Sequence, residues 1–182
     1  MTERTSGRER GLRPAHRLAA AALALGALAP LAACGGSGPD EPPPAPDDVP
    51  AYEVARQDVL AAVQQVVGAD GWAQEDDASA TAQDDGRCVV FLPDASTTRA
   101  GGEGYDLLAD VPDALAPVLD EHGFGEPSGV EEAEHGGTAS VTAVDAAGWE
   151  VRVTADGDVV RLDMSGPVDL DPCAGSALPE LA

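Results

Sequence analysis

Three cysteines are the residues of this 182-residue chain whose chemistry could define it. Cys34 follows an apolar run near the N-terminus, whereas Cys88 and Cys173 lie far downstream. The chain contains no Cys-x-x-Cys motif and no histidine stands near Cys88 or Cys173, so the spacing does not indicate a zinc site or a redox-active pair. The role of Cys34 determines whether the other two cysteines are left to pair with each other.

The residues around Cys34 resemble the lipobox of bacterial lipoproteins. Leu31-Ala32-Ala33-Cys34 is followed by glycine, and each of these positions fits that motif. A positively charged segment ending at Arg17 and an uncharged apolar run over 18–33 precede it, as in a secretory signal peptide. The run has 16 residues, fewer than the roughly 20 of a membrane-spanning helix, which disfavours a permanent transmembrane anchor. Ordinary signal-peptidase cleavage after Ala33 is a second alternative, but it needs a small residue two positions earlier, where leucine stands.

The resemblance implies a processed protein that is anchored by lipid. The signal peptide, residues 1–33, would be removed by cleavage between Ala33 and Cys34, and a diacylglyceryl group would be attached to the sulfur of Cys34. Two or three acyl chains anchor a protein stably, because each buried methylene contributes about 0.8 kcal/mol. We therefore expect the lipid on Cys34 to hold the mature chain at the cell membrane, on its extracytoplasmic face.

The two downstream cysteines form an even pair once Cys34 carries lipid. An extracytoplasmic compartment is oxidising, so we predict a disulfide between Cys88 and Cys173. In the chain-entropy description, closing a loop of this length stabilises a fold by roughly 4 to 5 kcal/mol. A reactive or metal-binding thiol is the alternative, and no motif supports it.

The histidines and carboxylates offer one weak metal site. His122, Glu131, Glu134 and His135 could supply nitrogen and oxygen ligands to a divalent metal, but their spacing matches no known ligand pattern. A solvated acidic loop is the favoured interpretation. No Gly-x-Ser-x-Gly motif is present, and the stretch "GGEGYD" over 101–106 lacks the third glycine of a phosphate-binding loop. We expect no cofactor and no enzymatic activity.

The charge of the chain excludes one class of partner. Residues 1–33 carry five arginines and two glutamates, a net charge of +3, whereas the 149 residues from Cys34 onward carry 31 carboxylates and five arginines, a net charge of −26. Binding to nucleic acid relies on neutralising phosphates with basic side chains, so a nucleic-acid partner is excluded. Lysine, asparagine and isoleucine are absent, which is typical of a high-GC genome such as those of actinobacteria.

The spacing of apolar residues along the chain predicts the helices and strands that position these side chains. Residues 34–50 are rich in Gly, Pro and Asp and cannot bury a core, which predicts a disordered tether. Periods of 3.6 and 2 then alternate along the chain. The expected elements are a helix over 51–67 that ends at Gly68, a short strand around Trp72, a buried strand over 87–93, a loop from Ser96, a short turn over 105–110, and a helix over 112–122 distorted at Pro117.

The last third of the chain alternates between apolar and polar residues over 138–145, 149–155 and 158–164. Asp156-Gly157 between the last two segments is typical of a tight turn, so these segments predict an antiparallel meander. The expected fold class is α+β in two layers, with an antiparallel sheet that ends in this three-stranded meander and two helices packed on one of its faces. The whole forms a single globular domain over 51–182.

In layout, the lipobox, the Pro-rich tether, the N-terminal helix and the terminal meander resemble the small cell-envelope lipoproteins of actinobacteria, a group of largely uncharacterised function. The resemblance implies a non-enzymatic interaction or accessory module, whose partner is an unknown envelope protein or small ligand. The alternative is a lipoprotein that binds a divalent metal or a small ligand around residues 122–135.

Overall fold

The computed structural model describes residues 42–98 and 103–181. The expected signal peptide over 1–33, the lipidated Cys34, the first part of the tether over 34–41, and Gly101 and Gly102 of the glycine-rich stretch lie outside the described residues. The described elements are a 3₁₀ turn at Pro46–Asp48, α1 (Val49–Val67), β1 (Trp72–Glu75), β2 (Ser79–Ala82), β3 (Cys88–Phe91), β4 (Asp94–Thr98), α2 (Glu103–Leu108), α3 (Val111–Glu121), β5 (Glu131–Glu132), β6 (Thr138–Val144), β7 (Glu150–Asp156), β8 (Val159–Val168) and a 3₁₀ turn at Gly175–Ala177.

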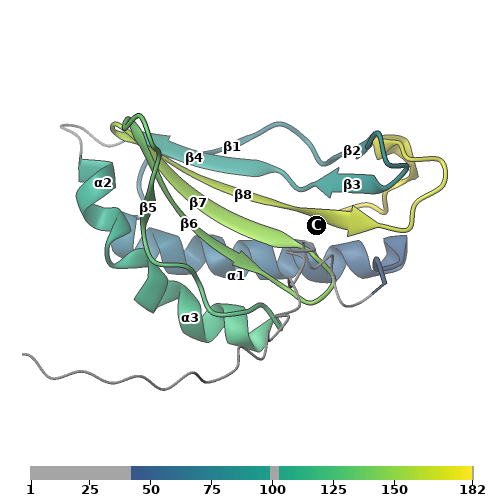
Figure 1. Ribbon diagram of the computed structural model, residues 1–182, viewed down its shortest axis with the longest axis horizontal. Coiled ribbons are helices and arrows are strands. Elements are labelled where there is room, and N and C mark those ends of the chain that lie inside the picture. Colours follow the sequence, from purple (N-terminus) through teal and green to yellow (C-terminus); the bar gives the residue numbers. More distant parts are fainter. Residues whose placement is uncertain (1–41, 99–102, 182) are drawn as a thin grey trace, which may run out of the picture. The chain divides into compact units, whose positions relative to one another are not determined.

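The strands form one antiparallel sheet with helices packed on one side of it, which confirms the expected α+β class (Figure 1). In the described residues the sheet has eight strands in the order β1-β4-β8-β7-β6-β5, and β3 pairs with β8 beyond the end of β4 and carries β2 at its edge. The predicted meander is confirmed as β6, β7 and β8. The β7–β8 turn uses Gly157, whose φ of 60° lies in the left-handed region that glycine tolerates.

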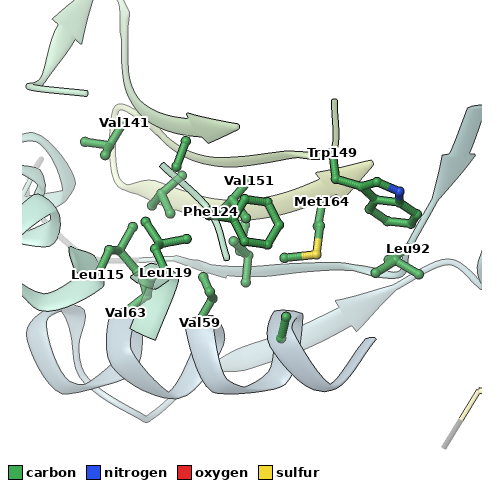
Figure 2. Close-up of a cluster of buried hydrophobic side chains, with 14 of the residues drawn as sticks. Val59, Val63, Leu92, Leu115, Leu119, Phe124, Val141, Trp149, Val151 and Met164 are labelled. Carbon is green, nitrogen blue, oxygen red and sulfur yellow. The ribbon is translucent and has the colours of Figure 1, made fainter. Parts of the chain in front are cut away.

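Alternation along the strands and helical spacing along α1 and α3 direct apolar side chains from both layers into one core. Val151 and Val153 of β7 point inward between exposed or half-exposed neighbours, as an amphipathic strand requires. Leu115 and Leu119 of α3 and Val63 of α1 meet them from the helical layer (Figure 2). The helix predicted over 51–67 is confirmed as α1, with Gly68 as its C-cap at a φ of 102°.

One aromatic side chain closes the core near the β6–β7 turn. Trp149 is fully buried, and its ring lies so close to Gly166 of β8 that a Cβ there would come within 2.2 Å of the indole Cγ. The ring of Tyr52 from α1 stacks on the same indole, with centroids 3.9 Å apart and planes 7° apart. Glycine at position 166 is therefore what allows the large side chain to enter the core.

Several expectations about the middle of the chain differ from the structure. The stretch from Ser96, expected as a loop, begins within β4, a strand that pairs with both β1 and β8. Its inward residues are Ala95 and Thr97, which are too small or too polar to produce a hydrophobic signal. The segment around Trp72 contains not only the expected strand β1 but also β2. The short turn expected over 105–110 is the helix α2, and the helix expected over 112–122 is α3, with Pro117 inside it.

Candidate functional site

A groove of about 410 Å³ lies where the chain enters the domain. Its walls come from the segment before α1, the first turns of α1, the end of α3 and the β6–β7 turn, which are far apart in sequence. The lining residues are Pro42, Pro44, Asp48, Ala51, Tyr52, Ala55, His122, Gly123, Asp145, Ala146 and Ala147. This volume is within the range of pockets that bind small molecules, about 300 to 1,000 Å³.

Tyr52 and Asp145 form the rigid wall of this groove. The Tyr52 hydroxyl donates a hydrogen bond of 2.9 Å to one oxygen of Asp145, and the other oxygen accepts a bond of 2.8 Å from the backbone N–H of Trp149. The edge of Phe124 meets the Tyr52 ring at a centroid distance of 6.4 Å. The Asp145 carboxylate therefore links helix α1 to the β6–β7 turn at this wall of the groove.

His122 also lines the groove, directly after the end of α3. Its Nε2 lies 2.9 Å from an oxygen of Asp58 on α1. This contact joins the two helices, and Asp58 is largely exposed, so the pair contributes little to stability. Of the weak metal candidates, His122 is the one that the structure places in the groove.

The other weak candidates lie elsewhere. Glu131 belongs to β5 at the edge of the sheet, and Glu134 and His135 occupy the exposed turn that leads into β6. Within residues 42–98 and 103–181, no three His, Cys, Asp or Glu side chains come together as a metal ion would require. The four residues that the sequence suggested as ligands are therefore not assembled into one site.

A second hollow, of about 420 Å³, opens on the polar face of the sheet. The register that pairs Ala95 with Leu162 places Asp94 beside Asp163 across strands β4 and β8. Burial and the neighbouring Asp94 carboxylate raise the pKa of Asp163 to about 6, while Arg161 and Arg152 act in the opposite direction. The Arg152 guanidinium lies 2.7 Å from Glu150. The hollow is predominantly acidic, because its lining holds five carboxylates and this one arginine.

The predicted disulfide is present. Cys88 and Cys173 are bonded, which fastens the C-terminal segment to β3. Both cysteines also line a third groove of about 500 Å³, together with Pro42 and Pro43. The disulfide therefore lies beside Pro42 and Pro43, where the chain enters the domain.

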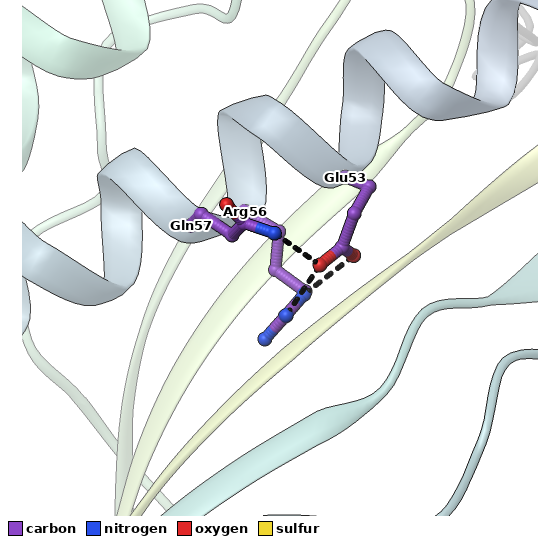
Figure 3. A network of polar contacts seen from close by, with 3 residues as sticks. All are labelled: Glu53, Arg56 and Gln57. Carbon is purple, nitrogen blue, oxygen red and sulfur yellow. Dashed lines mark hydrogen bonds and ion pairs between the residues drawn. The ribbon is translucent and has the colours of Figure 1, made fainter. Parts of the chain in front are cut away.

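A buried ion pair in α1 was not foreseen from the sequence. Glu53 and Arg56 are 4% and 3% exposed, and two bonds of 2.8 and 2.6 Å join the guanidinium to the carboxylate, which also accepts a bond from Gln57 (Figure 3). An i,i+3 spacing of opposite charges is common on solvated helix faces, so the sequence held no signal of burial. The two side chains bond to each other, and neither of them lines the groove at Tyr52.

The structure thus defines an α+β domain whose C-terminal segment is fastened by a disulfide and whose surface carries the hollows described above. No protein-family profile matches the chain, and no curated protein matches it. Among solved structures, the chain is similar to a DUF4853 family protein from Actinomyces odontolyticus, with a TM-score of 0.47 and 9% identity over 75% of this chain and 77% of the other. In the part of the chain that the structure describes, no helix is long and apolar enough to cross a membrane.

Proposed function

We propose that this protein is a lipoprotein held by Cys34 at the extracytoplasmic face of the cell membrane, where it binds an envelope partner and performs no catalysis. The lipobox at residues 31–34 and the Pro-rich segment after it support the anchor. The bond between Cys88 and Cys173 supports the compartment, because disulfides persist in oxidising surroundings.

The side chains that line the groove at Tyr52 favour binding over catalysis. Its polar side chains are engaged internally: Tyr52 with Asp145, His122 with Asp58, and Asp48 with the backbone of Ala45. The described lining contains no serine, threonine or cysteine that His122 could activate as a nucleophile. A preformed groove with satisfied polar groups is suited to recognition by shape.

Membrane fractionation tests the anchor. Cells producing the Cys34→Ala variant should release the protein from the membrane fraction, whereas the matched Ser37→Ala variant, altered three residues later, should keep it there. Intact mass of the membrane form should correspond to a chain that begins at an acylated Cys34. A mature chain that begins at another residue contradicts the anchor.

Site-specific photocrosslinking in the intact envelope tests the binding role. Ala51 and Ala61 are both exposed alanines on α1, but only Ala51 lines the groove. A crosslinker at position 51 should give a discrete adduct and one at position 61 should give none. Equal labelling at both positions, or at neither, refutes the groove as the recognition surface.

Titration separates the alternative of a divalent-metal site. Because the candidate ligands are not assembled, Ca²⁺ and Zn²⁺ should give no calorimetric heat and no shift in melting temperature. A saturable heat that is lost in a His122→Ala variant would instead establish a metal-binding lipoprotein.

A further inference from the structure

The residues just before α1 belong to the folded domain. The backbone N–H of Asp169, just after β8, donates a hydrogen bond of 2.9 Å to the carbonyl of Pro44. The N–H of Ala45 donates to the Asp48 carboxylate at 3.0 Å, and the N–H of Asp48 returns a bond of 3.0 Å to the Ala45 carbonyl. Residues 42–48 are therefore held against the domain, within a segment that the sequence assigned to a free tether.

These bonds define the end of the domain from which the chain leaves. Pro42 lines both the groove at Tyr52 and the groove beside the disulfide. We call this the anchored end; it contains the β2–β3 turn, the β6–β7 turn and the end of β8, because the strands are antiparallel. The far end contains α2, the turn at residues 133–137 and the β7–β8 turn, and Figure 1 shows α2 and β3 at opposite ends of the sheet.

The length of chain available between anchor and domain is short compared with the domain. Only the seven residues 35–41 separate Cys34 from Pro42. Fully extended, they reach at most about 25 Å. The ten residues of β8 alone extend the sheet over about 33 Å between the two ends. An anchor of this reach attached at one end keeps that end nearer to the membrane on average.

The charge at the anchored end works against contact of this end with anionic lipid headgroups, so adsorption is not what would hold it near the bilayer. Its exposed side chains are mostly acidic, and anionic lipid headgroups repel such a surface. The exposed carboxylates there are Asp47, Asp48, Asp84, Asp85, Asp169 and Asp171, with Arg87 as the neighbouring cation. The short attachment, and not adsorption to headgroups, would therefore keep this end of the domain near the bilayer.

We propose that the anchored end faces the bilayer and that the far end is presented to the cell envelope. This orientation rests on the proposed lipidation of Cys34. It places the groove at Tyr52 beside the membrane surface, within reach of partners that are themselves held at the membrane. The turn that carries His135 points toward the outer layers of the envelope.

Paramagnetic relaxation from the membrane surface tests the orientation. The lipidated chain, labelled with ¹⁵N-glycine, is placed in phosphatidylglycerol-containing nanodiscs whose headgroups carry a gadolinium chelate. The amides of Gly86 and Gly148 at the anchored end should broaden strongly, and those of Gly136 and Gly157 at the far end should broaden at least several-fold less. Equal broadening of the two pairs, or the reverse order, overturns the proposal.

A second preparation separates this failure from failure of the anchor. Residues 34–182, which contain the whole described domain, are coupled through the Cys34 thiol to a maleimide lipid, so the geometry is tested even if cells do not lipidate this cysteine. Inserting about 20 Gly and Ser residues after Ser37 adds an r.m.s. reach of about 25 Å and should remove most of the contrast between the glycine pairs. If the contrast survives the insertion, adsorption sets the orientation and the proposal is wrong.

Discussion

Replacing Asp163 with asparagine should stabilise the protein at neutral pH. Asp163 is half-buried beside Asp94, and its pKa is raised from the ordinary 3.8 to about 6, chiefly by burial and then by the neighbouring carboxylate. That difference corresponds to about 3 kcal/mol if it is expressed fully. Because the side chain is only partly buried, solvent screening reduces the expected gain to about 1 to 2 kcal/mol.

The sign of the pH dependence follows from where the proton binds. Between pH 4 and pH 6 the folded chain holds a proton on Asp163 that the unfolded chain has released, so the free energy of unfolding falls as the pH rises through this window. Above about pH 7 the destabilisation is complete. The Asp163→Asn variant carries no charge in either state, so its advantage over the native chain should be present at pH 7.5 and nearly absent at pH 4.

Urea unfolding followed by tryptophan fluorescence at pH 7.5 and pH 4 measures both quantities. Asp156→Asn is the matched control, since Asp156 pairs with Thr138 and Val159 and faces no carboxylate across the strands. It should change the free energy of unfolding by less than about 0.5 kcal/mol at either pH. A destabilised Asp163→Asn protein at pH 7.5, or an advantage of the same size at both pH values, refutes the reasoning.

Three further substitutions test the packing around the groove and the staple. Gly166→Ala should lower the free energy of unfolding by about 3 kcal/mol or more because its Cβ meets the buried indole, whereas Gly129→Ala, with open space around it, should be nearly neutral by thermal melting. Replacing Cys88 and Cys173 together by alanine should lower the free energy of unfolding by about 2 to 5 kcal/mol in chemical denaturation, the upper end being the chain-entropy value, and a midpoint equal to that of the native chain would show that the bond is dispensable. Tyr52→Phe keeps the aromatic stack but removes one hydrogen bond, so a loss of about 1 kcal/mol is expected, and no measurable loss would contradict a rigid groove wall.

The meander could be predicted because its inward residues are large. Val151, Val153 and Leu162 alternate with polar neighbours, and period-2 alternation of this kind specifies both a strand and the face it buries. Strand β4 could not be predicted in the same way, since Ala95 and Thr97 carry no such pattern. It forms because β8 is longer than its neighbours on that side and offers its backbone to β3 and β4 in turn.

The groove was not predictable because its walls come from separate elements. Helical spacing predicts the helix over 51–67 that carries Tyr52, but nothing local indicates that the Tyr52 hydroxyl reaches Asp145, 93 residues away. The acidic hollow depends on Asp94, whose strand was missed. The disulfide was predictable because it required only a compartment and an even number of free cysteines.

The disulfide and the segment before α1 both hold the short stretch of chain that follows β8. The bond from Asp169 holds Pro44, and the disulfide holds Cys173 four residues later, so residues 168–173 are fixed at both ends. If Cys34 carries the proposed lipid, tension on that anchor would reach the domain at Pro44, where the chain that continues into α1 and the hydrogen bond from Asp169 beside β8 would share it. Because β8 pairs with β3, β4 and β7, the part of the load that Asp169 receives would fall on a strand held by three neighbours. The hydrogen bond at Pro44 therefore ties the segment before α1 to the strand with the most pairing partners among the described residues.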